Sequence, residues 1–350
     1  MTLAPRIRHA TTHDGVDVAY YAIGRGPTLV YLPWSIISHV AREWEDREQR
    51  HWLKRLASRR RIIRLDHRGT GLSDRRAAFT VQGGADDIDA VTRAEGSQRF
   101  ALFGQVHSTV PAILYASQFP ERVSQLILWC GFADYREFFR TSPPLQAARA
   151  AADKDWDTYT ELIAQQATGW ADGAHARRLA AYFRESATSE HYLRCIDHFQ
   201  TVDIRAKLVG LRMPVLVLQP REAAFPTLEI GKRLAANIPG ARLVVLEGAN
   251  LLPFIGHAES VATLLDQFIV DPDARPRPEG LTEREIEILE RLAGGFSNHG
   301  IARELAISTR TVERHIGNLY LKIGAHNRAQ ATAYAIRKGL VSGIDARSIG

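Results

Sequence analysis

The chain has 350 residues, of which 45% are hydrophobic, and carries a formal charge of +6 with a pI near 9.4. This size and apolar content predict two domains with a packed core, and the basic charge is typical of proteins that contact a polyanion. The two cysteines, Cys130 and Cys195, are too few for a disulfide framework, and we see no signal-peptide or membrane-spanning apolar run, so we expect a cytoplasmic protein without a membrane partner.

Short apolar runs alternate with helical patterns in the first part of the chain. Strands are predicted at 16–23, 28–32, 61–65, 100–103, 125–129, 215–218 and 243–246. Helices are predicted at 43–58, 85–93, 108–118, 228–237 and 259–268. Buried strands that alternate with helices in this order indicate an α/β fold with a mostly parallel sheet.

The alternation stops after Gly131. Residues 133–211 have mainly helical patterns and many large aromatic side chains. We expect most of these side chains to form helix–helix contacts. An insertion of this kind between two strands is expected to cover the strand ends, so we predict a helical lid at about 132–212.

Several local motifs of the first 270 residues follow one known pattern. They are Asp66-x-Arg68-Gly69-x-Gly71-x-Ser73, Phe103-Gly104, Tyr115-Ala116, Pro120-Glu121-Arg122-Val123, Pro214-Val215-Leu216-Val217-Leu218 and Ile238-Pro239-Gly240. Together they resemble the α/β-hydrolase fold, and in particular the hydrolase-type sensor domains that are fused to LuxR-type or cyclase domains. The resemblance implies a first domain over residues 1–270.

The resemblance also shows where the catalytic residues of a hydrolase would stand. Such enzymes carry a nucleophilic serine at the centre of Gly-x-Ser-x-Gly, with a histidine and a carboxylate as partners. Here the motif reads Gly104-Gln105-Val106-His107-Ser108, so Val106 takes the nucleophile position. Leu251 stands at the histidine position, and Glu222 is the carboxylate nearest to the acid position. Because two of the three positions are aliphatic, we predict that the domain is not an enzyme, and we expect no metal or cofactor.

A displaced nucleophile is the main alternative to this interpretation. Ser108 lies next to His107, but adjacent residues of a helix do not face each other. We therefore expect Ser108 to satisfy backbone donors in the first turn of the helix that follows. An enzyme that uses Ser108, Ser35 or Cys130 remains the alternative, and it would make the chain a bifunctional ester hydrolase.

The shape of the hydrolase pocket is expected to remain. The backbone N–H of His107 and the loop Pro33-Trp34-Ser35 would form an oxyanion hole in an enzyme, and without a nucleophile they could hold a carbonyl, carboxylate or hydroxyl group. We predict a small-molecule site, with Leu252 as a further apolar wall, lined by Trp34, Ser35, Val106, His107, Leu251 and Phe254. Two alternatives stay open: His107 can be a structural histidine, and the domain can be kept only for dimerisation.

A proline-rich segment with mixed charges, 271–280, is predicted to be a linker. After it, Ser297 precedes a short helix at 298–305, Ala306-Ile307 forms a bend, and Ser308 is a suitable N-cap for a longer helix that ends at Gly324. Two helices joined by a tight bend indicate a helix-turn-helix motif, whose second helix enters the major groove of DNA.

The longer helix has two faces. Val312, Ile316, Leu319 and Ile323 repeat at helical spacing and form an apolar face. The opposite face is basic and polar. The residues that we predict to contact DNA are Arg310, Thr311, Val312, Arg314, His315, Asn318 and Lys322.

The last 70 residues resemble a LuxR-type DNA-binding domain from Leu281 to about Val341. The resemblance rests on Leu281-Thr282-Glu283-Arg284-Glu285, Ser297-Asn298, Ile301-Ala302, Thr311-Val312, Lys322-Ile323-Gly324 and Asn327-Arg328-Ala329. One departure is His299-Gly300, where the family has a charged pair. Gly300 removes the acid of a capping box and costs about 1 kcal/mol in a helix, so we expect this helix to begin late or to fray.

These observations predict a DNA-binding transcription regulator. The partners are double-stranded DNA, a small-molecule effector and a second copy of the chain. In the resembled family the final helix, 327–338, is a dimer contact, and it carries small residues here, namely Ala329, Ala331, Ala333 and Ala335. A DNA-binding scaffold that responds to no ligand is the second alternative.

Overall fold

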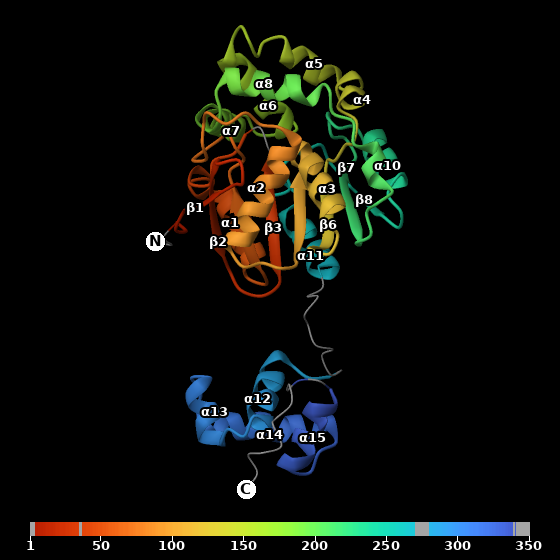
Figure 1. The fold of residues 1–350 in the computed structure, drawn as a ribbon. Helices are drawn as coiled ribbons and strands as arrows, with labels where there is room; N and C mark the ends of the chain where they lie inside the picture. The colour runs from red at the N-terminus through yellow and green to blue at the C-terminus, as the bar shows by residue number, and fades with distance from the viewer. Residues whose placement is uncertain (1–3, 35–36, 270–279, 339, 341–350) are drawn as a thin grey trace. The chain divides into compact units, whose positions relative to one another are not determined.

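The computed structural model of the protein describes residues 4–34, 37–269, 280–338 and 340. The contacts divide the chain into two compact units, residues 1–272 and 273–350, and each is described here by itself. Apart from Gly280, the predicted linker at 271–280 lies outside the described residues. Figure 1 shows the helices and strands of both units.

An eight-stranded sheet forms the centre of the first unit, in the order β1-β2-β4-β3-β5-β6-β7-β8. Strands β1 and β2 are antiparallel to their neighbours, and the remaining pairs are parallel. The strands are β1 (Arg8–Thr11), β2 (Asp17–Ile23), β3 (Thr28–Trp34), β4 (Arg61–Leu65), β5 (Phe100–Gln105), β6 (Val123–Trp129), β7 (Val215–Pro220) and β8 (Arg242–Leu246). This mostly parallel sheet confirms the predicted fold class.

Helices cover the sheet. Helices α2 and α3 contact each other, α1 contacts α11, and α10 contacts β7 and β8. Figure 1 shows α2 and α3 in front of the strands. The bounds are η1 (Arg42–Trp44), α1 (Arg47–Ala57), α2 (Val81–Ala94), η2 (Val106–Ser108), α3 (Thr109–Gln118), α10 (Leu228–Ala236) and α11 (Ala258–Phe268), where η denotes a 3-10 helix.

The lid lies between β6 and β7 in the chain, as the sequence predicts. Figure 1 shows its helices gathered over one end of the sheet. They are α4 (Tyr135–Arg140), α5 (Pro143–Arg149), α6 (Trp156–Ala167), α7 (Gly173–Ser186), α8 (Ser189–Phe199) and α9 (Arg205–Leu208). Many of the lid aromatics are buried and stack on one another, for example Tyr159 on Trp156, with ring centroids 5.2 Å apart.

Two elements differ from the expectation. The pattern predicts one helix over 43–58, but the structure has η1 followed by α1, because the Asp46 carboxylate accepts the backbone N–H groups of Glu48 and Gln49 and starts a new helix. Strand β1 was not expected, since its residues are mostly polar and exposed, as an edge strand permits.

The described residues of the second unit form four helices: α12 (Glu283–Ala293), α13 (Asn298–Glu304), α14 (Thr309–Ile323) and α15 (Arg328–Arg337). Their inward faces build a separate small core. Helix α14 ends at Gly324, which adopts a left-handed conformation with φ +66°.

Side chains cap the start of each of these helices. The Ser297 hydroxyl accepts the backbone N–H of Gly300, and the Ser308 hydroxyl accepts that of Thr311. Helix α13 therefore begins at Asn298, and the expectation that Gly300 delays its start is wrong. The hydroxyl cap is sufficient here because it acts on the backbone of residue 300, whatever side chain that residue has.

Candidate functional site

The sharp turn of a hydrolase nucleophile is kept at the end of β5. Val106 has φ +47° and is 1% exposed. A β-branched residue in this region costs roughly 1–3 kcal/mol, so the surrounding structure must hold it there. Gly104 is required at this turn, because a Cβ atom on it would lie 2.8 Å from the Ser108 carbonyl oxygen.

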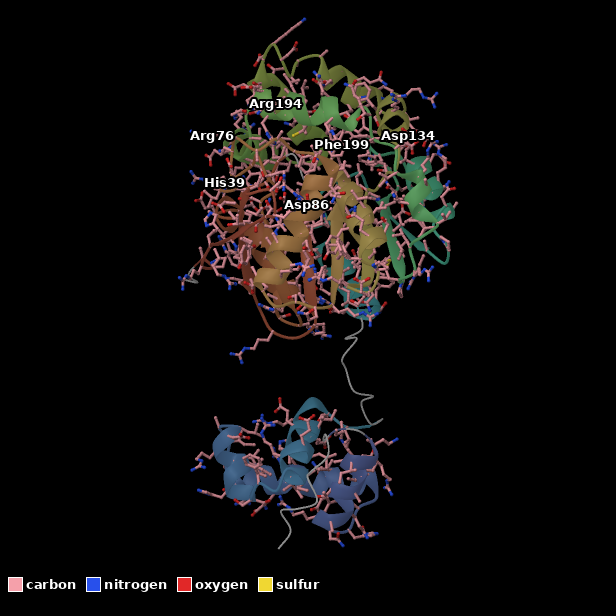
Figure 2. The ribbon with its side chains drawn as sticks, viewed as in Figure 1. His39, Arg76, Asp86, Asp134, Arg194 and Phe199 are labelled. Carbon is pink, nitrogen blue, oxygen red and sulfur yellow. The ribbon has the colours of Figure 1, made fainter. Side chains whose placement is uncertain are left out.

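His107 is enclosed beside the turn. Its Nδ1 accepts the indole N–H of Trp34 at 2.6 Å, and the two rings stack with centroids 6.0 Å apart. Burial lowers the pKa of His107 to about 3, so the ring is neutral near pH 7 and carries its proton on Nε2. Further rings surround it, among them Phe199, which Figure 2 labels where the lid meets the sheet.

The loop at the expected histidine position is closed by the lid. Leu251 is fully buried, its backbone N–H donates to the Ala167 carbonyl of α6, and its carbonyl accepts the indole N–H of Trp129 at 2.7 Å. Glu222 is exposed, whereas its neighbour Ala223 is buried. Of the three positions compared with a hydrolase triad, Val106 and Leu251 are buried and aliphatic, and Glu222 is exposed.

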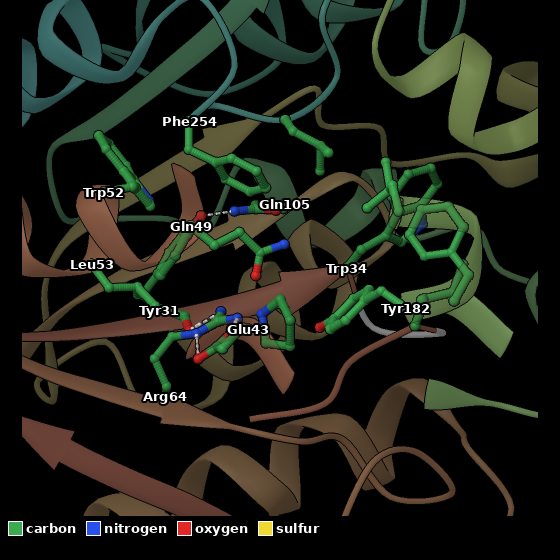
Figure 3. A pocket seen from close by; sticks show the side chains of 15 residues that line it. Tyr31, Trp34, Glu43, Gln49, Trp52, Leu53, Arg64, Gln105, Tyr182 and Phe254 are labelled. Carbon is green, nitrogen blue, oxygen red and sulfur yellow. Dashed lines mark hydrogen bonds and ion pairs between the residues drawn. The ribbon is translucent and has the colours of Figure 1, made fainter. Parts of the chain in front are cut away.

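A narrow pocket lies beside the turn, between β3, α1, α7 and the loop after β8 (Figure 3). Its empty volume is about 430 Å³, but the centres of water molecules fit into only about 30 Å³ of it. Of the six residues predicted to bind ligand, Trp34 and Phe254 line this pocket, whereas Val106, His107 and Leu251 do not. Ser35 lies outside the described residues.

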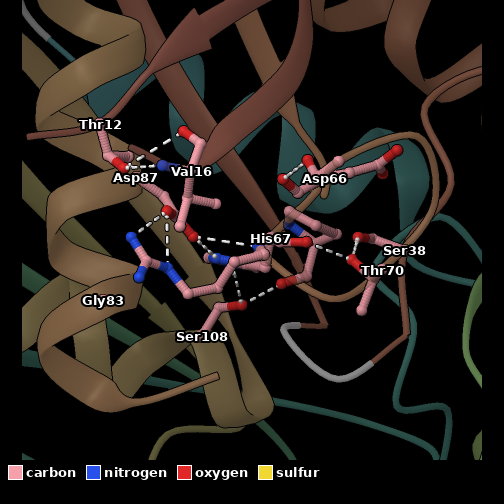
Figure 4. A network of polar contacts seen from close by, with 12 residues as sticks. Thr12, Val16, Ser38, Asp66, His67, Thr70, Gly83, Asp87 and Ser108 are labelled. Carbon is pink, nitrogen blue, oxygen red and sulfur yellow. Dashed lines mark hydrogen bonds and ion pairs between the residues drawn. The ribbon is translucent and has the colours of Figure 1, made fainter. Parts of the chain in front are cut away.

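Ser108 does not cap helix α3, contrary to the expectation. The Ser108 hydroxyl donates to the Pro33 carbonyl, and His67 Nε2 lies 3.1 Å from the Ser108 hydroxyl oxygen (Figure 4). His67 Nδ1 lies 3.8 Å from the Asp87 carboxylate, which also binds Arg68. The backbone of residues 106–109 turns the Ser108 side chain toward β3 and the loop after β4, so it joins those segments and leaves the helix start without a side-chain cap.

Ser108, His67 and Asp87 have the composition of a catalytic triad, but the hydrogen bond between Ser108 and His67 runs in the opposite direction. Since Ser108 gives its proton to Pro33, His67 must donate to Ser108, whereas a general base would accept from it. Burial lowers the pKa of His67, and Ser108 and Asp87 are fully buried. The other proposed nucleophile, Cys130, is also fully buried, and burial raises the pKa of its thiol, which keeps it protonated.

Helix α14 presents a polar stripe away from the core of the second unit. Arg310, Arg314 and Asn318 are exposed and follow one another at a spacing of four residues. Neither arginine makes an ion pair with any other described residue. Thr311 and His315 flank the stripe and are partly exposed. We call α14 the recognition helix from here on.

Two residues predicted to contact DNA make contacts within the domain. Val312 is fully buried in the core of the second unit, because it belongs to the apolar face of the helix. Lys322 donates to the buried carboxylate of Glu285 at 2.8 Å, so its charge is already paired within the domain. The sequence could not reveal this pair, because the two residues are 37 positions apart.

Sequence reasoning assigned no role to two exposed residues of the recognition helix. Leu321 is 85% exposed and lies three residues, about one helical turn, after Asn318 of the polar stripe. Gly317 faces open space, since a Cβ atom on it would meet nothing within 4 Å. Their i+3 and i+7 spacing from Arg314 is the signal that places them on the same face.

Helix α15 divides its small residues between two faces. Ala331 and Ala335 are fully buried in the core of the second unit and are therefore not available to a second copy of the chain. Ala329 and Ala333 are exposed, together with Ile336, which is 51% exposed. These three are the exposed alanine and isoleucine side chains among the described residues of α15.

None of the described helices is both long enough and apolar enough to cross a membrane. Within the same residues, no cluster of histidine, cysteine and acidic side chains has the arrangement of a metal site.

Comparisons with known proteins agree with this division. Residues 31–258 match the family model of the alpha/beta hydrolase fold, and residues 279–335 match that of bacterial regulatory proteins of the luxR family. The first unit is similar to an esterase from Rhodococcus sp. ECU1013, with a TM-score of 0.65, 22% identity, and coverage of 75% of this chain and 98% of that one.

Sequence relatives match one unit each. A pimeloyl-[acyl-carrier protein] methyl ester esterase of Neisseria meningitidis serogroup B is 28% identical over 55% of this chain and 75% of its own. The CsgBAC operon transcriptional regulatory protein of Escherichia coli is 53% identical over 16% of this chain and 26% of its own. The chain thus spans about a quarter of the regulators that it matches. It belongs to the alpha/beta hydrolase fold family and carries a C-terminal DNA-binding domain of the luxR family.

Proposed function

We propose that this protein is a ligand-responsive transcription regulator. Its hydrolase-like unit binds a small molecule with a carbonyl-type or carboxylate group without cleaving it, and the bound molecule changes the affinity of the luxR-type domain for DNA. The domain binds as a homodimer through the exposed face of α15, which matches a two-fold symmetric DNA site.

The observation that carries the proposal is Val106 at the elbow. Its φ of +47° retains the conformation that exposes a nucleophile in a hydrolase, but its side chain has no atom that can attack a carbonyl. Leu251 likewise offers no base. Loss of a nucleophile or base alone costs a hydrolase about 10⁴–10⁶ in rate, so the loss of both supports binding without turnover.

Esterase measurements on the full-length protein test whether the hydrolase-like unit binds without cleaving. We expect no hydrolysis of p-nitrophenyl acetate or butyrate above the buffer rate, and none after Val106→Ser, because residue 251 still supplies no base. Adding Leu251→His to Val106→Ser is the positive control for the position of the base. Efficient turnover by the wild-type protein would contradict the proposal.

A second candidate function is hydrolysis with Ser108 as the nucleophile, because His67 lies 3.1 Å from its hydroxyl oxygen. The burial of both side chains and the direction of their hydrogen bonds favour a structural role. The esterase assay separates the two, since turnover that disappears in Ser108→Ala but persists in Val106→Ala would support the second candidate.

The second part of the proposal is that a bound effector changes the affinity for DNA. A screen of acids, esters, amides and aromatic carbonyl compounds by thermal shift should find molecules that stabilise the hydrolase-like unit, by about 2.7 kcal/mol at 100 times their dissociation constant. The same molecules should change the retardation of promoter DNA by the full-length protein. A stabilising molecule that leaves DNA affinity unchanged would argue against a regulatory receptor.

A further inference from the structure

The pocket beside the elbow contains hydrogen-bond donors that the protein does not use. The indole N–H of Trp52, on α1, is buried and has no acceptor at hydrogen-bond geometry. The indole N–H faces the Tyr31 hydroxyl closely enough to lower the pKa of Tyr31, but the contact falls short of hydrogen-bond geometry. A buried donor without a partner costs about 1–3 kcal/mol, which a suitable ligand can recover.

Tyr31 supplies a second donor. Its hydroxyl oxygen accepts the side-chain amide of Gln105, and no described residue accepts its proton. Burial raises the pKa of Tyr31, so the hydroxyl keeps that proton at neutral pH. In Figure 3, Tyr31 and Trp52 border the pocket on one side, and the Gln49 amide reaches into its middle. Two neighbouring donors suit an oxygen atom with two lone pairs, such as a carbonyl oxygen.

The charges in the pocket are already balanced. Arg64 is the one cation among the described residues that line it, and its guanidinium binds both carboxylate oxygens of Glu43. Arg64 also donates to the Tyr31 carbonyl at 2.9 Å, and Glu43 also accepts the Tyr21 hydroxyl. A carboxylate ligand would therefore face Glu43 without a free cation to compensate, at a high cost in a buried site.

Much of the remaining wall is apolar, and the pocket shares lining residues with a wider groove. Phe183, Leu252 and Phe254 provide apolar surface for the body of a ligand. The pocket and the groove share Gln49, Leu179 and Tyr182 as lining residues. The groove is much larger, with about 590 Å³ open to the centres of water molecules. We infer that a ligand enters through this groove, because the three shared residues place the two cavities side by side. The pocket itself has room for about two water molecules, so a larger ligand must move α7 outward.

We propose that this pocket binds an uncharged molecule through a carbonyl-type oxygen, which accepts hydrogen bonds from Trp52 and Tyr31, while its apolar body packs against Phe254 and α7. The elbow and its enclosed His107 do not hold the ligand. The inference rests on the proposed receptor function and narrows its ligand class, because it excludes carboxylates.

Fluorine NMR with two probes of nearly equal size tests the assignment on the full-length protein. We expect 4-fluoroacetophenone, which is neutral, to bind at least tenfold more tightly than 4-fluorobenzoate. Trp52→Phe removes the donor but keeps most of the ring, and should weaken binding of the ketone threefold to tenfold. Trp44→Phe is the matched control, because the Trp44 indole N–H is also buried and unpartnered but does not line the pocket.

Several outcomes would overturn the assignment: no binding of the ketone at millimolar concentration, equal binding of the benzoate, or equal losses in Trp52→Phe and Trp44→Phe. If Trp52→Phe does not fold, Tyr31→Phe tests the second donor with the same expected loss. DNA retardation distinguishes this inference from the function on which it rests. A ketone that binds through Trp52 without altering DNA affinity would retain the pocket and reject the receptor.

Discussion

The elbow of the hydrolase-like unit and the recognition helix place polar side chains in opposite ways. Around the elbow, His107, Ser108 and His67 are all buried, and their hydrogen bonds join segments of the same domain. On the recognition helix, Arg310 and Arg314 are exposed and make no ion pair with a described residue. The difference indicates that the polar groups at the elbow join segments of their own domain, whereas those of the recognition helix are available for contact with another molecule.

The largest expected effect comes from opening the buried ion pair. Glu43→Leu leaves Arg64 charged and unpaired in the interior, so we expect a loss of about 3–5 kcal/mol in the free energy of unfolding. Denaturant titration of the hydrolase-like unit measures it. The double variant Glu43→Leu/Arg64→Met should recover part of the loss. A small loss in the single variant would mean that water reaches Arg64, so that the contrast between a buried first unit and an exposed recognition helix would not hold.

The enclosed histidine predicts a pH dependence. The pKa of His107 is lowered to about 3 from its ordinary value of 6.5, so the unfolded chain binds more protons between these values. Stability should therefore fall as the pH decreases below about 6.5, by about 2 kcal/mol at pH 5 from this residue. His107→Phe should make unfolding less sensitive to pH in this range. Some sensitivity should remain, because burial also lowers the pKa of His191 to about 4.

A pair of cation variants sharpens the contrast within the second unit. Arg314→Ala should weaken DNA binding about fivefold at 0.15 M salt and reduce the salt slope by about one, as expected for the loss of one phosphate contact. Lys322→Met should leave the salt slope unchanged and lower the thermal stability of the domain, because Lys322 is paired with Glu285. If both variants change the slope equally, Lys322 leaves that pair when DNA binds.

The smallest expected effect concerns Gly317. Alanine at this position meets no neighbouring atom, so Gly317→Ala should stabilise α14 by up to about 1 kcal/mol. We expect the same change to weaken DNA binding, because a mid-helix glycine on an exposed face permits close approach of the DNA backbone. Thermal unfolding and DNA retardation measure the two effects separately. Tighter DNA binding would show that no such approach occurs.

Patterns of local origin could be predicted well from the sequence. The strands of the parallel sheet are continuous apolar runs, and the recognition helix repeats its apolar residues at helical spacing, so both were recognised. The absence of a nucleophile at residue 106 and of a base at residue 251 followed from motif positions, although inactivity stays a prediction. Strand β1 was missed because Arg8 and His9 lack an apolar pattern.

Features that depend on distant residues could not be predicted. Ser108 reaches back to Pro33 and His67, and Lys322 reaches Glu285, so their roles depend on contacts across many residues. The pocket is formed by α1 together with α7, and the donor of Trp52 becomes notable only when its surroundings are seen. For this reason the predicted ligand residues include two that line the pocket, Trp34 and Phe254, but not Trp52 or Tyr31.

One carboxylate oxygen of Glu285 links the start of the luxR-type domain to its recognition helix. Glu285 Oε2 accepts the backbone N–H and the hydroxyl of Thr282, which start α12, and it also accepts Lys322 Nζ from α14, each at 2.8 Å. Unravelling of the first turn of α12 would thus release the anchor of α14. The two helices should melt as one cooperative unit, and a pull on the chain at Thr282 would be transmitted mechanically to the helix that reads DNA.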